Sequence, residues 1–343
     1  MLLSITGGTG FVGAHTVAAM VRAGHRVRLL TRDESTVDGA LRPLGFDPGV
    51  VNVVVGDVLD EPSVAALVRG ADVVLHAASV YSFDSRQRAA MRHTNERGTE
   101  LVLAAARRAG AGRIIHVSSV AAMFPNQDRV IREDSPVGRA RETYLASKAA
   151  AEVIARRHQA DGAPVVITYP PALFGPHDPR LGDQITRLRN VLRGLMPIWP
   201  SGGLPIGDVR DTAALHASLL STSGGGRHFG PGHYLSTRDY VRALREVTGR
   251  ALPTIFLPAR AMLPVGRLAD LAQRVWPWRI PAEYGAVYTC ACATRVDETA
   301  STNGIAARPA AETLRDTVHW LHANGYLSDR QAGRVPSVSE VMA

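Results

Sequence analysis

Short apolar runs alternate with longer stretches in which apolar residues recur at helical spacing. Residues Leu2–Thr6 form the first apolar run, a glycine-rich segment follows, and a helical pattern then extends to about Arg22. The same alternation continues to about Tyr169. Strands that alternate with helices in this way are typical of βαβ units. The pattern therefore predicts an α/β fold built on a doubly wound parallel sheet.

The segment between the first strand and the first helix carries three glycines, Gly7, Gly10 and Gly13. Glycines at this spacing permit a tight turn, close backbone approach to a pyrophosphate and close helix–strand packing. The amides at the start of the helix then face the phosphate charge. The position of the motif between a strand and a helix predicts a Rossmann-like dinucleotide-binding turn.

The second half of the chain has a different composition, because glycine and proline become more frequent beyond Pro170. Such residues are typical of loops. Helical patterns in this half cover residues 184–193, 237–248 and 259–275. We expect a dinucleotide-binding Rossmann domain over residues 1–170, with segments near 205–222 returning to it, and a smaller, discontinuous substrate-binding domain over residues 171–343.

The end of the second predicted strand bears on the choice of dinucleotide. An acidic residue there suits the ribose 2′-hydroxyl of NAD(H), whereas an arginine suits the 2′-phosphate of NADP(H). The strand ends at Thr31 and is followed by Arg32. Asp33 is the competing candidate, but it lies one step further on and can equally pair with a neighbour. The sequence favours NADP(H) and leaves NAD(H) possible.

Lys148 is the only lysine of the chain, since the 39 lysines and arginines comprise one lysine and 38 arginines. It follows Tyr144 by four residues, so the two side chains share one side of a helix. A compact ammonium suits such a site better than a planar guanidinium. Lowering the pKa of a tyrosine from about 10 by about three units requires ~4 kcal/mol. The interaction energy with one positive charge ~4 Å away, at an effective dielectric of about 20, has that magnitude. We therefore expect Lys148 to lower the pKa of Tyr144, an acid–base group.

The apolar run at residues 114–117 ends in two serines, and the second is Ser119. A serine hydroxyl at a strand end can hold a substrate oxygen beside the tyrosine. The alternative interpretation is a buried strand that runs into a polar turn.

Together these motifs resemble the extended short-chain dehydrogenase/reductases over nearly the whole chain. The resemblance also covers Gly175-Pro176, the segment 208–211 and a closing helix from Arg308. It implies that Ser119, Tyr144 and Lys148 are catalytic. It also implies cofactor contacts from Gly7, Thr9, Gly10, Phe11, Val12, Gly13, Arg32, Asp57, Val58, Ala77, Ala78, Tyr144, Lys148 and Pro171.

Arg32 in the Thr-Arg-Asp segment is more similar to the dihydroflavonol-reductase-like and 3β-hydroxysteroid-dehydrogenase-like branch than to the sugar epimerases. The epimerases carry an arginine just before the aspartate that corresponds to Asp208, and residues 204–207 contain none. The sugar dehydratases carry an Asp-Glu pair after the serine, where this chain has Val120-Ala-Ala-Met123. Before the Gly175-Pro176 segment, this chain has Pro170-Pro171 where the family usually has Arg-Pro.

Bulky residues near the predicted site are candidates for the substrate wall, although each could equally belong to the core. They are Val80, Tyr81, Phe83, Met123 and Phe124, with Pro171 and the region of Trp276 as further candidates. Trp276 and Trp278 stand on a basic, apolar background that could cap the pocket or, as the less favoured alternative, touch a membrane surface.

Composition narrows the function classes. The net charge of +8 and pI near 10.0 raise the question of nucleic acid, but the arginines are spread along the chain rather than clustered. We therefore expect a small-molecule substrate and no nucleic acid. No secretory signal and no apolar run of ~18 residues is seen, so we expect a cytoplasmic monomer or homodimer without membrane insertion. Cys290 and Cys292, two apart in an apparent strand, and the scattered histidines give no metal site.

Three functions remain open. The first is an NADPH-dependent oxidoreductase that interconverts a ketone or aldehyde and an alcohol on a mainly apolar molecule. The second is a nucleotide-sugar epimerase that keeps NAD tightly bound, against which Arg32 argues. The third is a regulator that senses NADP(H) without turnover, which would not need an acid–base pair. The dinucleotide retained on purification would discriminate among them.

Overall fold

The computed structural model describes residues 1–82, 85–222, 225–272, 284–297 and 302–334. Its centre is a seven-stranded sheet in the order β11-β7-β5-β4-β1-β2-β3, in which every neighbouring pair is parallel. The strands are β1 (Leu2–Thr6), β2 (Arg26–Thr31), β3 (Val51–Val55), β4 (Val73–His76), β5 (Arg113–Val117), β7 (Val165–Tyr169) and β11 (Gly226–Phe229). The predicted α/β fold with a Rossmann-like parallel sheet is confirmed.

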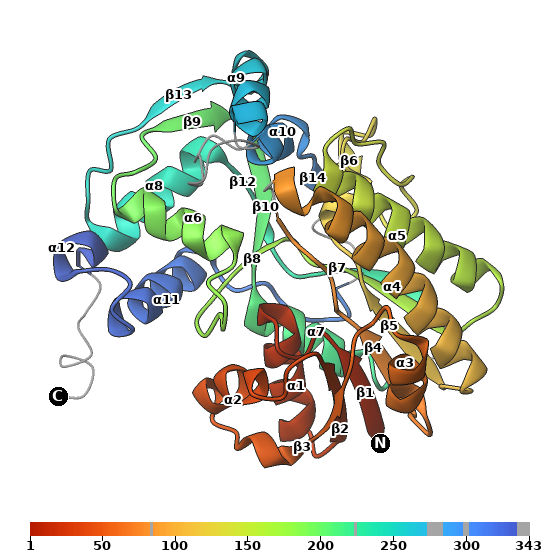
Figure 1. The fold of residues 1–343 in the computed structure, drawn as a ribbon. Coiled ribbons are helices and arrows are strands. Elements are labelled where there is room, and N and C mark those ends of the chain that lie inside the picture. The colour runs from red at the N-terminus through yellow and green to blue at the C-terminus, as the bar shows by residue number, and fades with distance from the viewer. Residues whose placement is uncertain (83–84, 223–224, 273–283, 298–301, 335–343) are drawn as a thin grey trace.

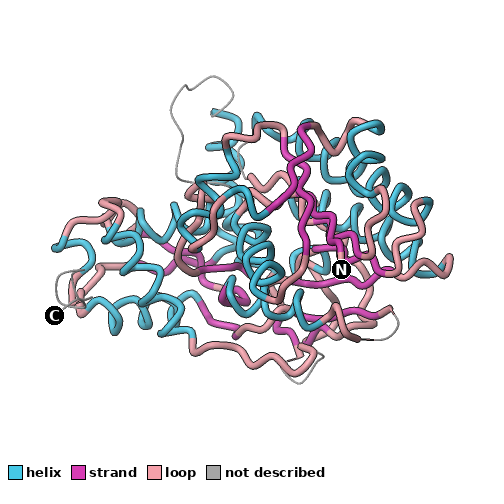
Figure 2. Tube along the Cα trace, turned by 90° about the horizontal axis from the view of Figure 1, so that it is seen from below, coloured by secondary structure: helices cyan, strands magenta, loops and turns pink. Residues whose placement is uncertain are grey.

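Helices cover both faces of this sheet, as Figure 2 shows around the N-terminal strands. On one face the apolar core joins α3, α4 and α5 to the strands, and on the other it joins α1, α2 and α7. The bounds are α1 (Phe11–Arg22), α2 (Thr36–Leu41), α3 (Glu61–Val68), α4 (Arg88–Arg108), α5 (Thr143–Ala160) and α7 (Val209–Ser218). Because all seven strands are parallel, their carboxyl ends meet at one edge, which is where ligands bind in such sheets.

A second apolar core gathers elements from the later part of the chain. It includes side chains of α6 (Asp183–Leu192), α8 (Thr237–Thr248) and α11 (Ala310–Ala323). Figure 1 shows these helices on the opposite side of β8 and β10 from the parallel sheet. The remaining elements are β6 (Val130–Ile131), β8 (Ala172–Phe174), β9 (Ile198–Ser201), β10 (Gly203–Asp208), β12 (His233–Ser236), β13 (Ile255–Pro258), β14 (Arg295–Val296), α9 (Ala259–Ala272), α10 (Tyr284–Cys292) and α12 (Asp329–Ala332), with 3₁₀ turns at Arg42–Leu44, Pro48–Val50, Ser85–Gln87 and Val120–Met123.

These smaller strands form a three-stranded sheet, β12-β10-β8, and two two-stranded sheets, β13-β9 and β14-β6. The chain returns to the parallel sheet afterwards, since α7 packs against α1 and β11 pairs with β7. We propose that residues 1–170, with the later segments that return to the parallel sheet, bind the cofactor. Residues 171–343 would then form the substrate-binding region.

One element differs from its prediction. Cys290 and Cys292 lie at the end of the helix α10, not in a strand. A strand would have placed the two thiols on one face. Residues two apart on a helix point in different directions, so the two thiols point apart. A short apolar run of this kind does not separate a strand from a buried helix by its pattern. Trp276 and Trp278 lie outside the described residues, as does the end of the helix predicted over 259–275.

Candidate active site

The glycine-rich turn leaves room only for backbone at two positions. Gly7 has φ 73°, and a Cβ added there would stand 2.6 Å from the amide nitrogen of Ala78. A Cβ on Gly13 would overlap the carbonyl oxygen of Gly7. The following helix α1 has neither a side-chain N-cap nor an acidic residue in its first turn. The uncapped helix amides and a turn without side chains at these two positions fit the pyrophosphate of a dinucleotide.

Two groups that the sequence did not single out contact this turn. The Arg180 guanidinium, from the loop between β8 and α6, donates a hydrogen bond to the Thr9 hydroxyl at 3.2 Å. The His15 ring lies 3.0 Å from the carbonyl oxygen of Pro176 and packs edge to face against Phe11. Burial lowers the pKa of His15 to about 4, so the ring is neutral near pH 7. The loop after β8 is thereby fixed over the start of α1.

At the end of β2, the Arg32 side chain is open to solvent, whereas the Asp33 side chain is already hydrogen-bonded within the protein. Arg32 is exposed, whereas the Asp33 carboxylate accepts hydrogen bonds from the Ser35 hydroxyl at 2.7 Å and the Ser35 amide at 2.9 Å. These bonds lower the pKa of Asp33. Arg28 points elsewhere, because its guanidinium donates to the carbonyls of Leu67 at 2.9 Å and Arg69 at 2.7 Å.

The other predicted cofactor residues occupy the same edge of the sheet. Asp57 follows β3, and its carboxylate accepts from the Leu59 amide at 2.9 Å. Val58 packs into the core beside α4. The Ala77 amide, directly after β4, donates to the Thr6 carbonyl at 3.2 Å, and the Ala78 amide donates to the Thr6 hydroxyl at 3.3 Å. Pro171 is buried directly before β8.

The start of α5 brings the three predicted catalytic residues together. Glu142 caps the helix by accepting from the Leu145 amide at 2.9 Å. Ser119 caps the 3₁₀ turn after β5, and its hydroxyl also shares a hydrogen bond with the Tyr144 side chain. Lys148 is 6% exposed, and its ammonium donates to the Val117 carbonyl at 3.4 Å and the Ser79 hydroxyl at 3.5 Å. A phenol, a hydroxyl and an ammonium thus converge beside the end of β5.

Burial dominates the electrostatics of this group. It raises the pKa of Tyr144, the Ser119 hydrogen bond opposes the rise only partly, and the charges of Glu142 and Asp183 add to it. The expectation that Lys148 lowers the pKa of Tyr144 is therefore wrong for this structure. Lys148 is not among the groups that shift the pKa of Tyr144, and its ammonium is hydrogen-bonded to Val117 and Ser79 instead. Burial also lowers the pKa of Lys148 to about 8.

The predicted substrate wall divides into residues at the site and residues behind it. The Tyr81 and Tyr144 rings meet edge to face, and Gln184 of α6 donates to the Tyr81 hydroxyl at 3.2 Å. Val80 is half-buried beside them. Met123 and Phe124, in contrast, are 0% and 2% exposed and belong to the core. They back the site rather than line it, contrary to expectation, because the 3₁₀ turn directs them inward; Phe83 lies outside the described residues.

A buried asparagine that the sequence interpretation missed joins the segment after β4 to α5. The Asn95 amide of α4 bonds the backbone of Val80 on both sides, at 2.8 and 3.1 Å, and donates to the Ser147 hydroxyl at 3.0 Å. It also accepts from the Ser79 hydroxyl at 3.1 Å. Asparagine is a poor helix former, so its place inside a 21-residue helix with a buried apolar face was a signal that could have been followed.

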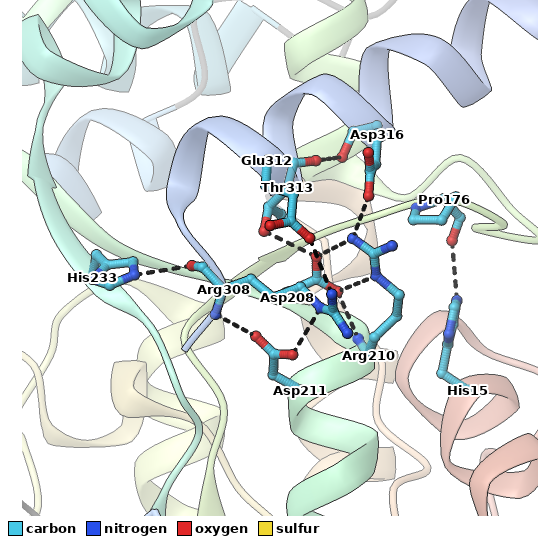
Figure 3. Close-up of polar contacts among 11 residues, drawn as sticks. His15, Pro176, Asp208, Arg210, Asp211, His233, Arg308, Glu312, Thr313 and Asp316 are labelled. Carbon is cyan, nitrogen blue, oxygen red and sulfur yellow. Dashed lines mark hydrogen bonds and ion pairs between the residues drawn. The ribbon is translucent and has the colours of Figure 1, made fainter. Parts of the chain in front are cut away.

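An ionic cluster joins β10 and α7 to the closing helix α11 (Figure 3). The Arg210 guanidinium bridges the carboxylates of Asp208 and Asp316, both at 2.7 Å, and the Thr313 hydroxyl donates to Asp208 at 2.9 Å. Burial alone would raise the pKa of Asp208, but the bonds from Arg210 hold it below its ordinary value. The neighbouring Arg308 pairs with Asp211 at 2.9 Å. This cluster fixes the end of β10 and the start of α7 to α11.

A cavity of about 170 Å³ lies near the end of β11. Pro171, Phe229, Tyr234 and Ile305 are among its lining residues. Because Tyr144 and Lys148 are not in its lining, we do not place the chemistry there. Among the residues in the described ranges, no three His, Cys, Asp or Glu side chains gather as a metal site would require. Within those ranges, too, no helix combines the length and apolar character that crossing a membrane demands.

Comparison with known proteins places these features in a family. Residues 3–232 match the model of the NAD dependent epimerase/dehydratase family. The chain is 29% identical to a putative dihydroflavonol 4-reductase of Synechocystis sp., over 94% of this chain and 95% of the relative. It is 26% identical to sterol demethylase protein B of Methylococcus capsulatus, over 95% and 100%. It is also 26% identical to a 3-beta-hydroxysteroid dehydrogenase of Mycolicibacterium neoaurum, over 80% and 75%.

Solved structures share the fold along nearly the whole chain. The crystal structure of gox2253 aligns with a TM-score of 0.77 and 26% identity, over 96% of this chain and 99% of the other. The dTDP-glucose 4,6-dehydratase DesIV of Streptomyces venezuelae, solved with NAD bound, aligns with a TM-score of 0.73 and 23% identity, over 96% and 100%.

Proposed function

Since the chain belongs to the NAD dependent epimerase/dehydratase family, in the extended short-chain dehydrogenase/reductase branch, we propose that it is an NADPH-dependent reductase of ketones or aldehydes on mainly apolar small molecules. It is an oxidoreductase that uses a nicotinamide dinucleotide. The observation that carries the finer proposal is the convergence of three side chains near the end of β5. Ser119 lies beside Tyr144, and Lys148 follows one helical turn further along α5 with its ammonium 3.4 Å from the Val117 carbonyl.

The proposed chemistry uses three side chains in distinct roles. When bound, NADPH would supply the hydride that reduces the substrate carbonyl carbon. Ser119 donates a hydrogen bond to the carbonyl oxygen, and Tyr144 gives its phenolic proton to the same oxygen, so the alcohol forms with one hydride and one proton. Burial raises the pKa of Tyr144 and keeps the phenol protonated, which is the form that reduction requires.

Lys148 can return the proton. The lowered pKa of Lys148, about 8, lies close to neutral pH, so the ammonium can release a proton and regain it. Its partner Ser79 is exposed, so solvent lies beside the hydrogen bond between Lys148 and Ser79. We assign Lys148 to holding the cofactor ribose and to relaying the proton toward Tyr144.

The cofactor residues divide by the part of the dinucleotide that each would hold. The glycine turn and the α1 amides suit the pyrophosphate, and Arg180 beside Thr9 adds a positive charge there. Arg32 suits the 2′-phosphate, since it is exposed at the end of β2 while Asp33 is occupied by Ser35. This arrangement supports NADPH over NADH.

The substrate class follows from the aromatic wall and from the relatives. Tyr81 and Tyr144 present ring faces and edges that suit an apolar or cyclic substrate. The relatives named as dihydroflavonol 4-reductase and 3-beta-hydroxysteroid dehydrogenase support the same class.

A sugar-nucleotide enzyme with tightly held NAD is the second candidate. It is favoured by the 30% identity to the dTDP-glucose 4,6-dehydratase of Streptomyces antibioticus, over 73% of this chain and 78% of the relative. Residues 204–207 lack the arginine expected for a nucleotide-sugar diphosphate, which argues against it.

The dinucleotide content of the purified protein tests the choice. The protein is denatured, the released dinucleotide is identified, and the emptied enzyme is titrated with NADPH and NADH. The reductase proposal expects little retained cofactor and tighter binding of NADPH. Stoichiometric retained NAD would overturn it in favour of the sugar-nucleotide enzyme. NADPH binding without turnover of any carbonyl would favour a sensor.

A further inference from the structure

Exposed apolar side chains concentrate in one part of the described structure. Of the twelve large hydrophobic residues that are exposed in the described ranges, seven lie between residues 195 and 271. These seven are Leu195, Ile198, Ile255, Leu257, Val265, Leu268 and Leu271. They belong to α9, to the β9–β13 pair and to the segment just before it, which lie together at one end of the molecule in Figure 1, remote from α1 and α2.

The helix α9 carries most of this surface. Its inward side is marked by Ala259 and Gly266, which are buried, and a Cβ on Gly266 would stand 2.9 Å from the Cα of Tyr284 in α10. The opposite side exposes Val265, Leu268 and Leu271 at 60%, 67% and 58%. Ala261, Pro264 and Ala272 are exposed as well. The outward side of α9 is therefore apolar, the reverse of an ordinary surface helix.

The β9–β13 pair continues the apolar surface. Ile198 and Ile255 are paired in register, and both are exposed, as is Leu257. Between them the alternate residues turn inward: Trp199 is buried, and Phe256 is half-buried with the Arg238 guanidinium 4.5 Å from its ring centroid. The alternation shows that one side of this small sheet packs and the other faces outward with large aliphatic side chains. We call this side, together with the outward side of α9, the α9 face.

Positive charge borders the α9 face. Arg260 and Arg267 are exposed on one flank of α9, and the helix contains a single acidic residue, Asp270. The Arg267 guanidinium lies 5.3 Å from the Tyr284 ring centroid. An apolar helix side with arginines at its edge is the pattern of helices that lie in a membrane interface. A symmetric contact between two copies would pair this positively charged face with itself rather than with an opposite charge.

We propose that the α9 face docks the protein reversibly on an anionic lipid surface, with the aliphatic side chains at the headgroup boundary and the arginines on the lipid phosphates. The charge of the whole chain, +8, favours the same surface. The face adjoins the proposed site, because α10 packs against α9 and the Tyr288 hydroxyl of α10 accepts from the Arg141 amide at 3.3 Å, just before α5. Docking would place the site beside the lipid phase, and it does not depend on the proposed reductase activity.

Sedimentation with vesicles tests the docking. The full chain is mixed with vesicles of equal parts phosphatidylcholine and phosphatidylglycerol, or with phosphatidylcholine alone. We expect the wild type to sediment with the mixed vesicles, less with the neutral ones, and less at high salt. The double variant Val265→Ser/Leu268→Ser should bind about tenfold more weakly or worse, because two aliphatic side chains no longer enter the interface. Arg260→Gln should reduce the preference for anionic vesicles.

The matched control is Val153→Ser, since Val153 is 56% exposed on α5, away from the α9 face. It should sediment like the wild type. NADPH titration and thermal melting verify that each variant is folded. Absence of vesicle binding by the wild type, or equal binding by the double variant and the control, overturns the proposal. A wild-type dimer in light scattering that the double variant converts to monomer also overturns it, in favour of a second copy as the occupant.

Discussion

The rings of Tyr81 and Tyr144 meet edge to face, with their centroids 4.6 Å apart. Tyr81 comes from the segment after β4 and Tyr144 from the first turn of α5, and the Tyr81 hydroxyl accepts a hydrogen bond from Gln184 of α6. One aromatic contact thus ties the proposed general acid to the helix that follows the β8 loop.

Removing the Tyr81 ring should therefore impair reduction without preventing NADPH binding. An aromatic pair contributes about 0.5–1.5 kcal/mol beyond the burial of its area. Tyr81→Ala should lower kcat/KM by about three- to tenfold through a less well-positioned Tyr144. Tyr81→Phe keeps the ring and is the control, which should stay close to wild type. Steady-state kinetics and NADPH titration separate the two effects, and wild-type kinetics for Tyr81→Ala would contradict the role of the pair.

Lys148→Arg should impair activity although it retains the positive charge. The ammonium is almost wholly buried and bonded to Val117 and Ser79, so a planar guanidinium cannot take its place without displacing them. We expect a fall in kcat of about 10² or more, the scale of a lost acid–base group. Arg108→Lys, at an exposed position at the end of α4, serves as the control for the reverse exchange. Normal turnover of the all-arginine protein would refute the assignment of Lys148.

Substitutions of Arg32 and of Arg180 should change the affinities for NADPH and NADH in different ways. A charge-assisted hydrogen bond contributes about 1.5–3 kcal/mol, or one to two decades in affinity. Arg32→Ala should lose that factor for NADPH and leave NADH nearly unchanged. Arg180→Ala should weaken the binding of NADPH and of NADH, because both dinucleotides contain the pyrophosphate. Arg26→Ala, exposed at the start of the same strand as Arg32, is the control. Fluorescence titrations decide the matter, and equal loss of both cofactors in Arg32→Ala would contradict its phosphate role.

Acid should destabilise the fold below about pH 6.5 through buried neutral histidines. Burial lowers the pKa of His76 and of His216 to about 3. Below the ordinary pKa of 6.5 the unfolded chain therefore binds protons that the folded chain does not. The stability is fully present above that pH and falls as the pH approaches the lowered values, by about 1.4 kcal/mol per histidine for each pH unit.

The His216 ring gives this prediction a matched variant. It lies between the hydroxyls of Thr16 at 2.9 Å and Thr168 at 3.1 Å. His216→Gln should be less stable at neutral pH, but its stability should fall less steeply on acidification than that of the wild type. Urea unfolding at several pH values between about 7 and 5 measures the slope. Equal slopes for the two proteins would show that His216 does not contribute.

Local sequence patterns were sufficient for features that depend on neighbouring residues along one element. The strand Leu2–Thr6, the glycine turn after it and the Tyr144–Lys148 pair each follow from spacing along one element. Contacts between distant segments were not predictable in this way. Thr9 and Arg180 are 171 residues apart, and Tyr81 and Gln184 are 103 apart. Their pairing depends on how the β8 loop and α6 fold over the sheet.

Burial was the second property that spacing could not supply. The sequence interpretation weighed the charge of Lys148 on Tyr144 but not the desolvation that raises the pKa of Tyr144. In the same way, the sequence did not decide whether Met123 and Phe124 line the substrate wall or belong to the core, where the structure places them. Both questions depend on side-chain exposure, which is set by tertiary packing.

The most direct test of the central claim compares wild type and Tyr144→Phe in one assay. NADPH oxidation is followed with a panel of lipophilic and cyclic ketones and aldehydes, and NADPH affinity is measured on the same samples. The phenylalanine ring keeps the packing against Tyr81 but has no proton to give and no bond to Ser119. We predict carbonyl-dependent NADPH oxidation by the wild type, and a loss of about 10² to 10⁴ in rate for Tyr144→Phe with NADPH affinity retained. Near-normal turnover by Tyr144→Phe, or no carbonyl-dependent oxidation by the wild type, would contradict the account.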